Sequence, residues 1–207
     1  MSETVMARAE TRPLRAIPAG PVAWQRTGVI GTELVFPRGG ARPGATGGEP
    51  PGAERPGAHG TAVVAGGTPY SLQWRAVTDD DAGVQELSVS CRGADWSRTT
   101  ELRRTDGDWE CEGAARIDPD AVVRLADSPI FVTWALRRLG LTVESGPMCV
   151  PSVRILTPSL EVVPGTATYH LVSPRRLRIT GEGPAVTYEL DDAGLVAYQP
   201  GNLRLVR

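Results

Sequence analysis

Apolar and polar residues alternate along most of the chain from Thr61 onward, and this alternation constrains the fold more than any other feature of the sequence. In the segment Tyr70-Ser-Leu-Gln-Trp-Arg-Ala76, every even-numbered residue is apolar and every odd-numbered residue is polar. A period of two places apolar side chains on one face of a β-strand. The pattern therefore predicts strands with one buried face and one face in water, as in antiparallel sheets.

Turn residues separate these predicted strands at short intervals. Asp106-Gly107, between residues 99–104 and 108–112, is a strong hairpin signal because both positions tolerate positive φ. Further turns fall at 79–83, Gly165, Pro174, 181–184 and 192–194, and the later strands are expected at 153–156, 160–163, 167–172, 176–180, 185–190 and 195–198. Many short strands at this spacing predict a mainly β (α+β) chain, with a strongly curved antiparallel sheet or half-barrel.

The segment Asp127-Ser-Pro-Ile-Phe-Val-Thr-Trp-Ala-Leu-Arg-Arg-Leu-Gly140 predicts the one short helix. Asp127 or Ser128 suits the N-cap, and Pro129 suits the first helical position, where a missing N–H costs nothing. Gly140 suits the left-handed residue that follows a helix. Its broad apolar face leads us to expect that this helix packs on the concave side of the curved sheet.

Composition divides the chain into a leader and one domain. Residues 1–20 contain no apolar run and predict a disordered leader, and residues 21–207 predict a single β-rich domain. Within that domain, residues 37–60 hold 8 Gly and 5 Pro among 24 residues. Such a stretch buries too little apolar surface to offset its ordering entropy, so we expect a mobile insertion at 37–60.

Charge and cysteine content exclude several classes of protein. A net charge of −2 gives no bulk attraction to nucleic acid. The three cysteines, Cys91, Cys111 and Cys149, lack the CxxC spacing of zinc sites and do not suggest a disulfide framework. No segment is long and apolar enough to span a membrane, and the N-terminus does not read as a signal peptide. We therefore expect a soluble, cytoplasmic protein without a cofactor or a metal.

Four segments in a fixed order resemble the putative glycolipid-binding family of bacterial proteins. They are Ala94-Asp-Trp-Ser-Arg98, the helix segment Ser128-Pro-Ile-Phe-Val-Thr-Trp-Ala-Leu-Arg-Arg-Leu139, Thr157-Pro-Ser-Leu-Glu-Val-Val-Pro164 with Tyr169 after it, and Asp191-Asp-Ala-Gly-Leu-Val-Ala-Tyr-Gln-Pro-Gly201 with the residues to Arg207. The resemblance covers most of Cys91–Arg207, and Trp24 fits as an N-terminal anchor.

The resemblance implies a curved antiparallel sheet, a helix and an apolar cavity, similar to bacterial lipoprotein carriers and mycobacterial glycolipid carriers that hold acyl chains. Two features depart from the family pattern. The polar Thr-Asn-Thr of the family's helix segment is Phe131-Val-Thr133 here, and the family's internal Pro is Ala135. Ligand contacts near this helix are therefore expected to be more apolar than the family name suggests.

The candidate ligand-binding residues are the aromatic residues of the apolar face and the polar residues of the helix. Ligand sites are mostly apolar, with a few polar groups that fix orientation. Arg137 and Arg138 could hold an anionic head group, although complementing the helix C-terminus is the commoner role for such cations. For each aromatic residue taken singly, the core is the commoner place. The set is Trp74, Trp109, Phe131, Thr133, Trp134, Arg137, Arg138 and Tyr188.

Catalysis finds little support in the sequence. The chain has no nucleophile elbow, Walker loop or His-Glu-x-x-His pair, and its two histidines, His59 and His170, lie outside any such motif. The sequence thus favours a non-catalytic binding protein that holds a lipid, glycolipid or other amphiphile in an apolar cup. The alternatives are a ligand-free scaffold domain with a filled core and, less favoured, a hydrolase that uses Asp and His170.

Overall fold

The computed structural model describes residues 18, 20–38, 55–126, 128–181 and 183–206. Within these residues the chain forms fourteen strands, one α-helix and one short 3-10 turn. In chain order they are β1 (Val22–Arg26), β2 (Ile30–Arg38), β3 (Gly57–Ala65), β4 (Tyr70–Thr78), β5 (Val84–Arg92), β6 (Ser97–Thr105), β7 (Asp108–Glu110), β8 (Val122–Leu125), α1 (Pro129–Arg138), the 3-10 turn Val143–Ser145, β9 (Met148–Ile155), β10 (Val162–Ser173), β11 (Arg176–Thr180), β12 (Val186–Leu190), β13 (Val196–Gln199) and β14 (Leu203–Val206).

All fourteen strands belong to one sheet, in the order β7-β6-β5-β4-β3-β2-β1-β14-β13-β12-β11-β10-β9-β8. Neighbouring strands are antiparallel except β8 and β9, which are parallel. The pairing of β1 with β14, the first and last strands of the described residues, lies at the middle of the sheet. The predicted mainly β class, with a largely antiparallel sheet and one short helix, is confirmed. The sheet is open, because its edge strands β7 and β8 have no hydrogen-bonded pairing with each other in the described part.

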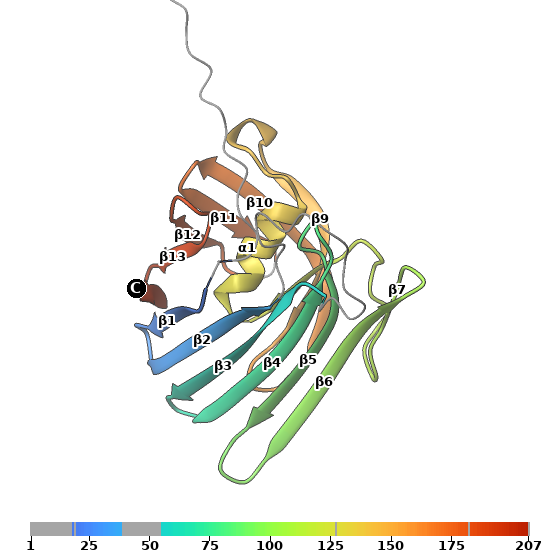
Figure 1. The fold of residues 1–207 in the computed structure, drawn as a ribbon, viewed down its shortest axis with the longest axis vertical. Coiled ribbons are helices and arrows are strands. Elements are labelled where there is room, and N and C mark those ends of the chain that lie inside the picture. Colours follow the sequence, from blue (N-terminus) through green and yellow to red (C-terminus); the bar gives the residue numbers. More distant parts are fainter. Residues whose placement is uncertain (1–17, 19, 39–54, 127, 182, 207) are drawn as a thin grey trace, which may run out of the picture.

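The connection between the two edge strands requires the sheet to bend. Only residues 111–121 separate β7 from β8 in the sequence, and a chain of that length spans at most about 40 Å. Fourteen strands laid flat would extend roughly 60 Å at the usual strand spacing. The sheet therefore curves, and Figure 1 shows α1 between the strands β1–β5 and the strands β9–β13.

The helix lies against the face of the sheet that we call the inner face. Every residue from Pro129 to Leu136 is buried, so the first two turns of α1 meet protein on all sides. The helix contacts β8 and β13, and its aromatic side chains reach β4 on the other half of the sheet. The expected packing of α1 on the apolar face is therefore what the structure shows.

Both ends of α1 follow from the residues found there. Ser128 is the N-cap residue and Pro129 opens the helix, but the Ser128 hydroxyl makes no capping hydrogen bond; Asp127 lies outside the described residues. At the other end Gly140 has a φ of +56°. The Gly140 N–H donates to the carbonyl of Arg137, and the Leu141 N–H donates to that of Leu136. This pair of bonds is a Schellman motif, which closes the helix as the glycine predicted.

The predicted insertion at 37–60 is shorter on both sides than its composition indicates. β2 continues to Arg38 and β3 begins at Gly57, so both ends of that stretch are strand. The inner face of β3 carries Ala58, Gly60 and Ala62, whose small side chains suit a surface on which bulky neighbours lie. From composition alone, such a run of small residues is predicted to be a loop. Residues 39–54, like most of the predicted leader at 1–20, lie outside the described residues.

Two predicted turns can be compared with the structure. The Asp106-Gly107 hairpin joins β6 to β7, and both turn residues have positive φ, as predicted. The predicted turn at Gly165, by contrast, lies inside β10, which runs from Val162 to Ser173. Pro164 and Gly165 pair with β9 on one side and lie beyond the end of β11 on the other. The missing N–H of a proline is tolerated where a strand has a partner on one side only.

Substituting Gly140 tests the helix end. The Gly140→Ala variant should unfold with a free energy about 1 kcal/mol lower than the wild type, because alanine is strained at this positive φ. Urea denaturation measures the difference. Gly67→Ala is the matched control, because Gly67 has an ordinary φ and a Cβ there meets no atom within 4 Å. An equal loss in both variants would contradict the account.

Candidate functional site

Three of the predicted ligand-binding aromatic residues form one cluster between α1 and β4. The Trp74 ring lies 5.1 Å from that of Phe131 and 6.1 Å from that of Trp134, and Phe131 and Trp134 are 5.0 Å apart, all between ring centroids. All three pairs meet edge to face, an arrangement that aromatic quadrupoles favour. The side chains are buried, with at most 3% of each residue exposed. The structure thus brings these three of the predicted residues together.

Gly60 on β3 makes room for the Trp74 ring. A Cβ at Gly60 would lie 2.4 Å from the indole, so only glycine allows the ring to lie across this strand. Lying there, the Trp74 Nε1–H donates a 2.9 Å hydrogen bond to Glu33 Oε1 on β2. The small residues of β3 thus allow β4 and β2 to be joined by a side chain that crosses over the strand between them.

Glu33 is the polar centre of the inner face. Only 2% of this residue is exposed, and its Oε1 accepts a second hydrogen bond, of 2.5 Å, from the Ser128 hydroxyl at the start of α1. One carboxylate therefore ties β2, β4 and the helix together. Buried charges are found where hydrogen bonds compensate for lost hydration. The sequence analysis did not identify Glu33. A signal was present, since Glu33 lies two residues before Val35 and so points to the same buried face of β2.

The helix also carries polar groups that face the core. The Thr133 hydroxyl donates a 3.3 Å hydrogen bond to the carbonyl of Gly194. The Trp134 Nε1–H is buried and has no acceptor among the residues that the structure describes. An unsatisfied buried donor of this kind costs roughly 1–3 kcal/mol. The aromatic cluster therefore contains one N–H group that could donate to a further oxygen atom.

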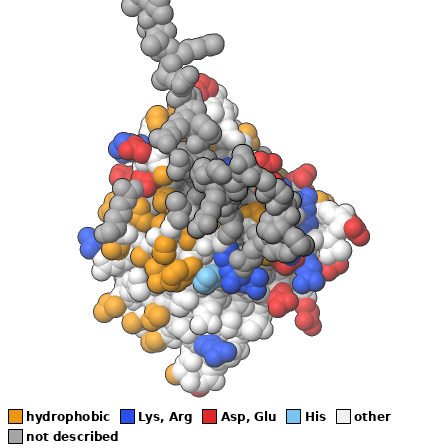
Figure 2. Space-filling model, viewed as in Figure 1, with side chains coloured by type: hydrophobic (Ala, Val, Ile, Leu, Met, Phe, Trp, Pro, Cys, Tyr) orange, Lys and Arg blue, Asp and Glu red, His pale blue; other side chains and the backbone are white. Residues whose placement is uncertain are grey.

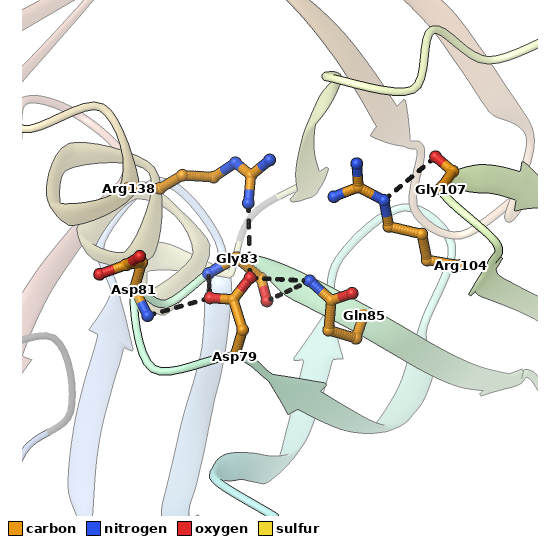
Figure 3. A network of polar contacts seen from close by, with 7 residues as sticks. All are labelled: Asp79, Asp81, Gly83, Gln85, Arg104, Gly107 and Arg138. Carbon is orange, nitrogen blue, oxygen red and sulfur yellow. Dashed lines mark hydrogen bonds and ion pairs between the residues drawn. The ribbon is translucent and has the colours of Figure 1, made fainter.

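The two helix arginines contact the turn between β4 and β5. Arg137 Nη2 donates to the carbonyl of Asp80 at 3.0 Å, and Arg138 Nη1 lies 3.7 Å from Asp79 Oδ2. Figure 3 shows Asp79 at the centre of this network, where it also accepts from the Gly83 N–H and from Gln85. Arg138 thus pairs with a carboxylate near the surface, and Arg137 bonds to a backbone carbonyl of the same turn.

The remaining two predicted residues lie outside the cluster. Trp109 is half-buried on edge strand β7, with the Arg104 guanidinium 6.0 Å from its ring centroid. Tyr188 is buried on β12, and its hydroxyl accepts a 3.3 Å hydrogen bond from Arg124 on β8. The structure thus brings Trp74, Phe131 and Trp134 together, places Thr133 on the same helix against Gly194, and leaves Trp109 and Tyr188 elsewhere.

The described residues offer little that resembles a catalytic or metal centre. Among them, no three His, Cys, Asp or Glu side chains are grouped so that they could hold a metal ion. His59, which the sequence placed in the insertion, lies on β3 and stacks on Phe36 with 5.2 Å between ring centroids. His170 is on β10, opposite Arg178 of β11. None of the described helices is long and apolar enough to cross a bilayer.

These features define a class of protein: an open, largely antiparallel β-sheet whose apolar inner face is covered by a single short helix. Residues 51–204 match the model of the family described as putative glycolipid-binding. The chain belongs to this family, as its sequence motifs indicated. No curated protein matches the sequence.

Two solved structures are similar to the chain. A DUF1089 family protein from Pseudomonas aeruginosa superposes with a TM-score of 0.62 at 19% identity, over 96% of this chain and 97% of that chain. A beta-barrel-like protein of the domain of unknown function DUF1849 from Brucella abortus gives a TM-score of 0.42 at 10% identity, over 94% of this chain and 98% of that one. At such identities the first comparison shows the fold alone.

The hydrogen bonds of Glu33 can be tested by substitution. Glu33→Ala leaves the Trp74 N–H and the Ser128 hydroxyl without this acceptor, so the free energy of unfolding should fall by about 2–4 kcal/mol. Glu33→Gln keeps an oxygen that can accept from Trp74 and should lose less. Chemical denaturation of both variants measures the difference. Equal losses, or no loss in either, would contradict the role assigned to the carboxylate.

The cysteines should differ strongly in reactivity. Cys91 is fully buried on β5, and this burial raises the pKa of its thiol, whereas Cys149 is exposed. Because the thiolate is the reactive form, a raised pKa slows modification at neutral pH. A thiol reagent should therefore label Cys149 first and Cys91 only after unfolding, as followed by mass spectrometry. Labelling of both at one rate in the native protein would contradict this order.

Proposed function

We propose that this protein is a non-catalytic binding protein that holds a lipid, glycolipid or other amphiphile against the inner face of its sheet. The membership of the putative glycolipid-binding family supports the class of ligand. The apolar inner face, which packs as one continuous cluster with α1, supports the place. The residues assigned to the site are Trp74, Phe131, Thr133 and Trp134.

One observation carries the proposal: the buried Trp134 N–H that lacks an acceptor in the described part of the chain. The Trp134 ring that carries it meets the rings of Trp74 and Phe131 edge to face. An amphiphile offers both matching elements, because its chain packs against aromatic rings and its ester or hydroxyl oxygen accepts a hydrogen bond. Binding would relieve the cost of the unsatisfied donor, which is roughly 1–3 kcal/mol.

Entry of a ligand would require part of α1 to move. The cluster side chains pack on one another. Of the four residues assigned to the site, only Trp74 lines any of five surface clefts in the described part of the chain. The helix C-terminus is held by Arg137 and Arg138, whose contacts to the β4–β5 turn lie near the surface. Exposed ion pairs of this kind contribute about 1 kcal/mol or less. This end of α1 is thus the more readily released end.

The contacts of the buried Glu33 carboxylate support the non-catalytic part of the proposal. Glu33 accepts from both Trp74 and Ser128, which assigns it to joining strands and helix. The packing of the cluster also favours a second candidate, a ligand-free scaffold domain with a filled core. The two functions differ in whether an amphiphile stabilises the fold.

Trp134→Phe separates them, because it removes the donor and keeps an aromatic ring. Octyl glucoside and lysophosphatidylglycerol, each below its critical micelle concentration, should raise the Tm of the wild type, since a ligand of the native state stabilises it. In Trp134→Phe the affinity obtained from this shift should fall roughly threefold to tenfold, the usual worth of one hydrogen bond. Thermal unfolding with and without each probe measures the effect.

Trp24→Phe is the matched control. The Trp24 Nε1–H donates a 2.7 Å hydrogen bond to the carbonyl of Val196, so this donor already has its acceptor within the fold. This variant should therefore have a lower Tm without ligand and keep the ligand-induced shift. A wild type that shows no shift with either probe would favour the scaffold. Equal loss of the shift in both variants would contradict the assignment of the site to Trp134.

A further inference from the structure

The outer face of the sheet, opposite α1, has an apolar half. Among the described residues nine large apolar side chains are exposed, and seven lie on this face of β13, β14 and β1–β3 or in the adjoining turn: Val29, Ile30, Leu34, Phe36, Val63, Tyr198 and Val206. Ile30 is 80% exposed and Val63 is 53% exposed. The strand register brings Leu34 beside Ala23, and Ala23 beside Val206. Contiguous apolar exposure of this kind marks an interaction surface.

The other half of the outer face, over β3–β6, is polar and cationic. A cleft of about 540 Å³ crosses it and is lined mainly by polar groups, among them Arg38, His59, Arg75, Ser88 and Glu101. Arg75 is exposed and forms no hydrogen bond or close ion pair with the described residues, and its charge acts on the Glu86 carboxylate of the next strand. At the outward strand positions from β14 to β6, five arginines (38, 75, 92, 103 and 204) accompany two glutamates (86 and 101). This face is thus positive on a chain whose net charge is −2.

The two halves meet along one row of the sheet. Phe36 is paired with His59, His59 with Arg75, and Arg75 with Ser88, on β2, β3, β4 and β5 respectively. The stacked rings of Phe36 and His59 form the boundary. Figure 2 shows hydrophobic side chains beside a histidine and basic side chains. From β1 to β6 the face extends roughly 24 Å at the usual strand spacing.

We propose that the outer side of β14 and β1–β6, the amphipathic face, docks on the surface of an anionic lipid bilayer. Exposed apolar side chains beside arginines are the features by which proteins bind the membrane interface, through partial insertion and attraction to anionic headgroups. The cleft over β3–β6 accommodates a headgroup next to Arg75. Trp74 also lines this cleft, but the other rings of the aromatic cluster, Phe131 and Trp134, lie on the opposite side of the sheet. The proposal does not need an amphiphile bound at the inner face.

Vesicle sedimentation tests the proposal with the full chain. The protein should sediment with vesicles of phosphatidylcholine containing about one third phosphatidylglycerol, and far less with phosphatidylcholine alone. Binding should weaken between about 0.05 and 0.5 M salt, because salt screens the attraction. Arg75→Glu should lower the partition coefficient at least roughly fivefold, the worth of one basic residue at an anionic surface. The double variant Ile30→Ser with Val63→Ser should lower it at low salt as well.

Matched controls come from the other end of the sheet. Arg178 on β11 is exposed, and Val172 on β10 is 45% exposed. Arg178→Glu and Val172→Ser should leave binding unchanged, and unfolding curves should show that all four variants are folded. No binding by the wild type, or equal losses in the control variants, would overturn the proposal. Loss of all binding on addition of inorganic phosphate would also overturn it, because that result indicates a site for a free anion. A dimer in sedimentation velocity that becomes a monomer in the Ile30→Ser with Val63→Ser variant would overturn it as well, because the face would then be an interface between two copies of the chain.

Discussion

One ten-residue helix has to lie against the apolar face of a fourteen-stranded sheet, and the rest of the structure depends on this constraint. The sheet bends until strands from both of its halves reach α1. Small residues on β3 let the Trp74 ring cross toward β2, and the Glu33 carboxylate fixes β2, β4 and the helix start in one arrangement. Removing the Glu33 carboxylate should therefore be costly. Each buried donor left without its acceptor lowers the free energy of unfolding by about as much as several surface ion pairs contribute.

Much of this fold is predictable from the sequence because local rules dominate it. Alternation fixes the inward face of β4, Asp106-Gly107 supplies the positive φ of a hairpin, and Pro129 and Gly140 mark the ends of α1. The features that were missed depend on partners far away in the sequence. Gly60 fits in strand β3 because the Trp74 ring occupies the space that a side chain would need there. Pro164 fits in β10 because β11 does not extend far enough to pair with it. Glu33 reads as an ordinary charged residue until the chain brings Ser128 to it, 95 positions later.

The candidate site divides in the same way. The aromatic periodicity and the helix placed Trp74, Phe131 and Trp134 in one apolar region, but no local pattern tells which ring N–H finds an acceptor. In the described residues Trp24 and Trp74 have one, whereas Trp134 in the cluster and Trp109 on edge strand β7 have none. That difference distinguishes a group available to a ligand from groups that only support the core. Under the two proposals, the inner face would hold an amphiphile and the outer face would meet a lipid surface.

Native mass spectrometry of the protein as purified without detergent tests the central claim most directly. If the inner face holds an amphiphile, a fraction of the molecules should carry one additional mass. Solvent extraction should release a lipid or glycolipid of that mass and leave protein at the mass of the bare chain. A single species at the bare mass before extraction, which stays bare after incubation with a total lipid extract and gives no amphiphile on extraction, would contradict the account.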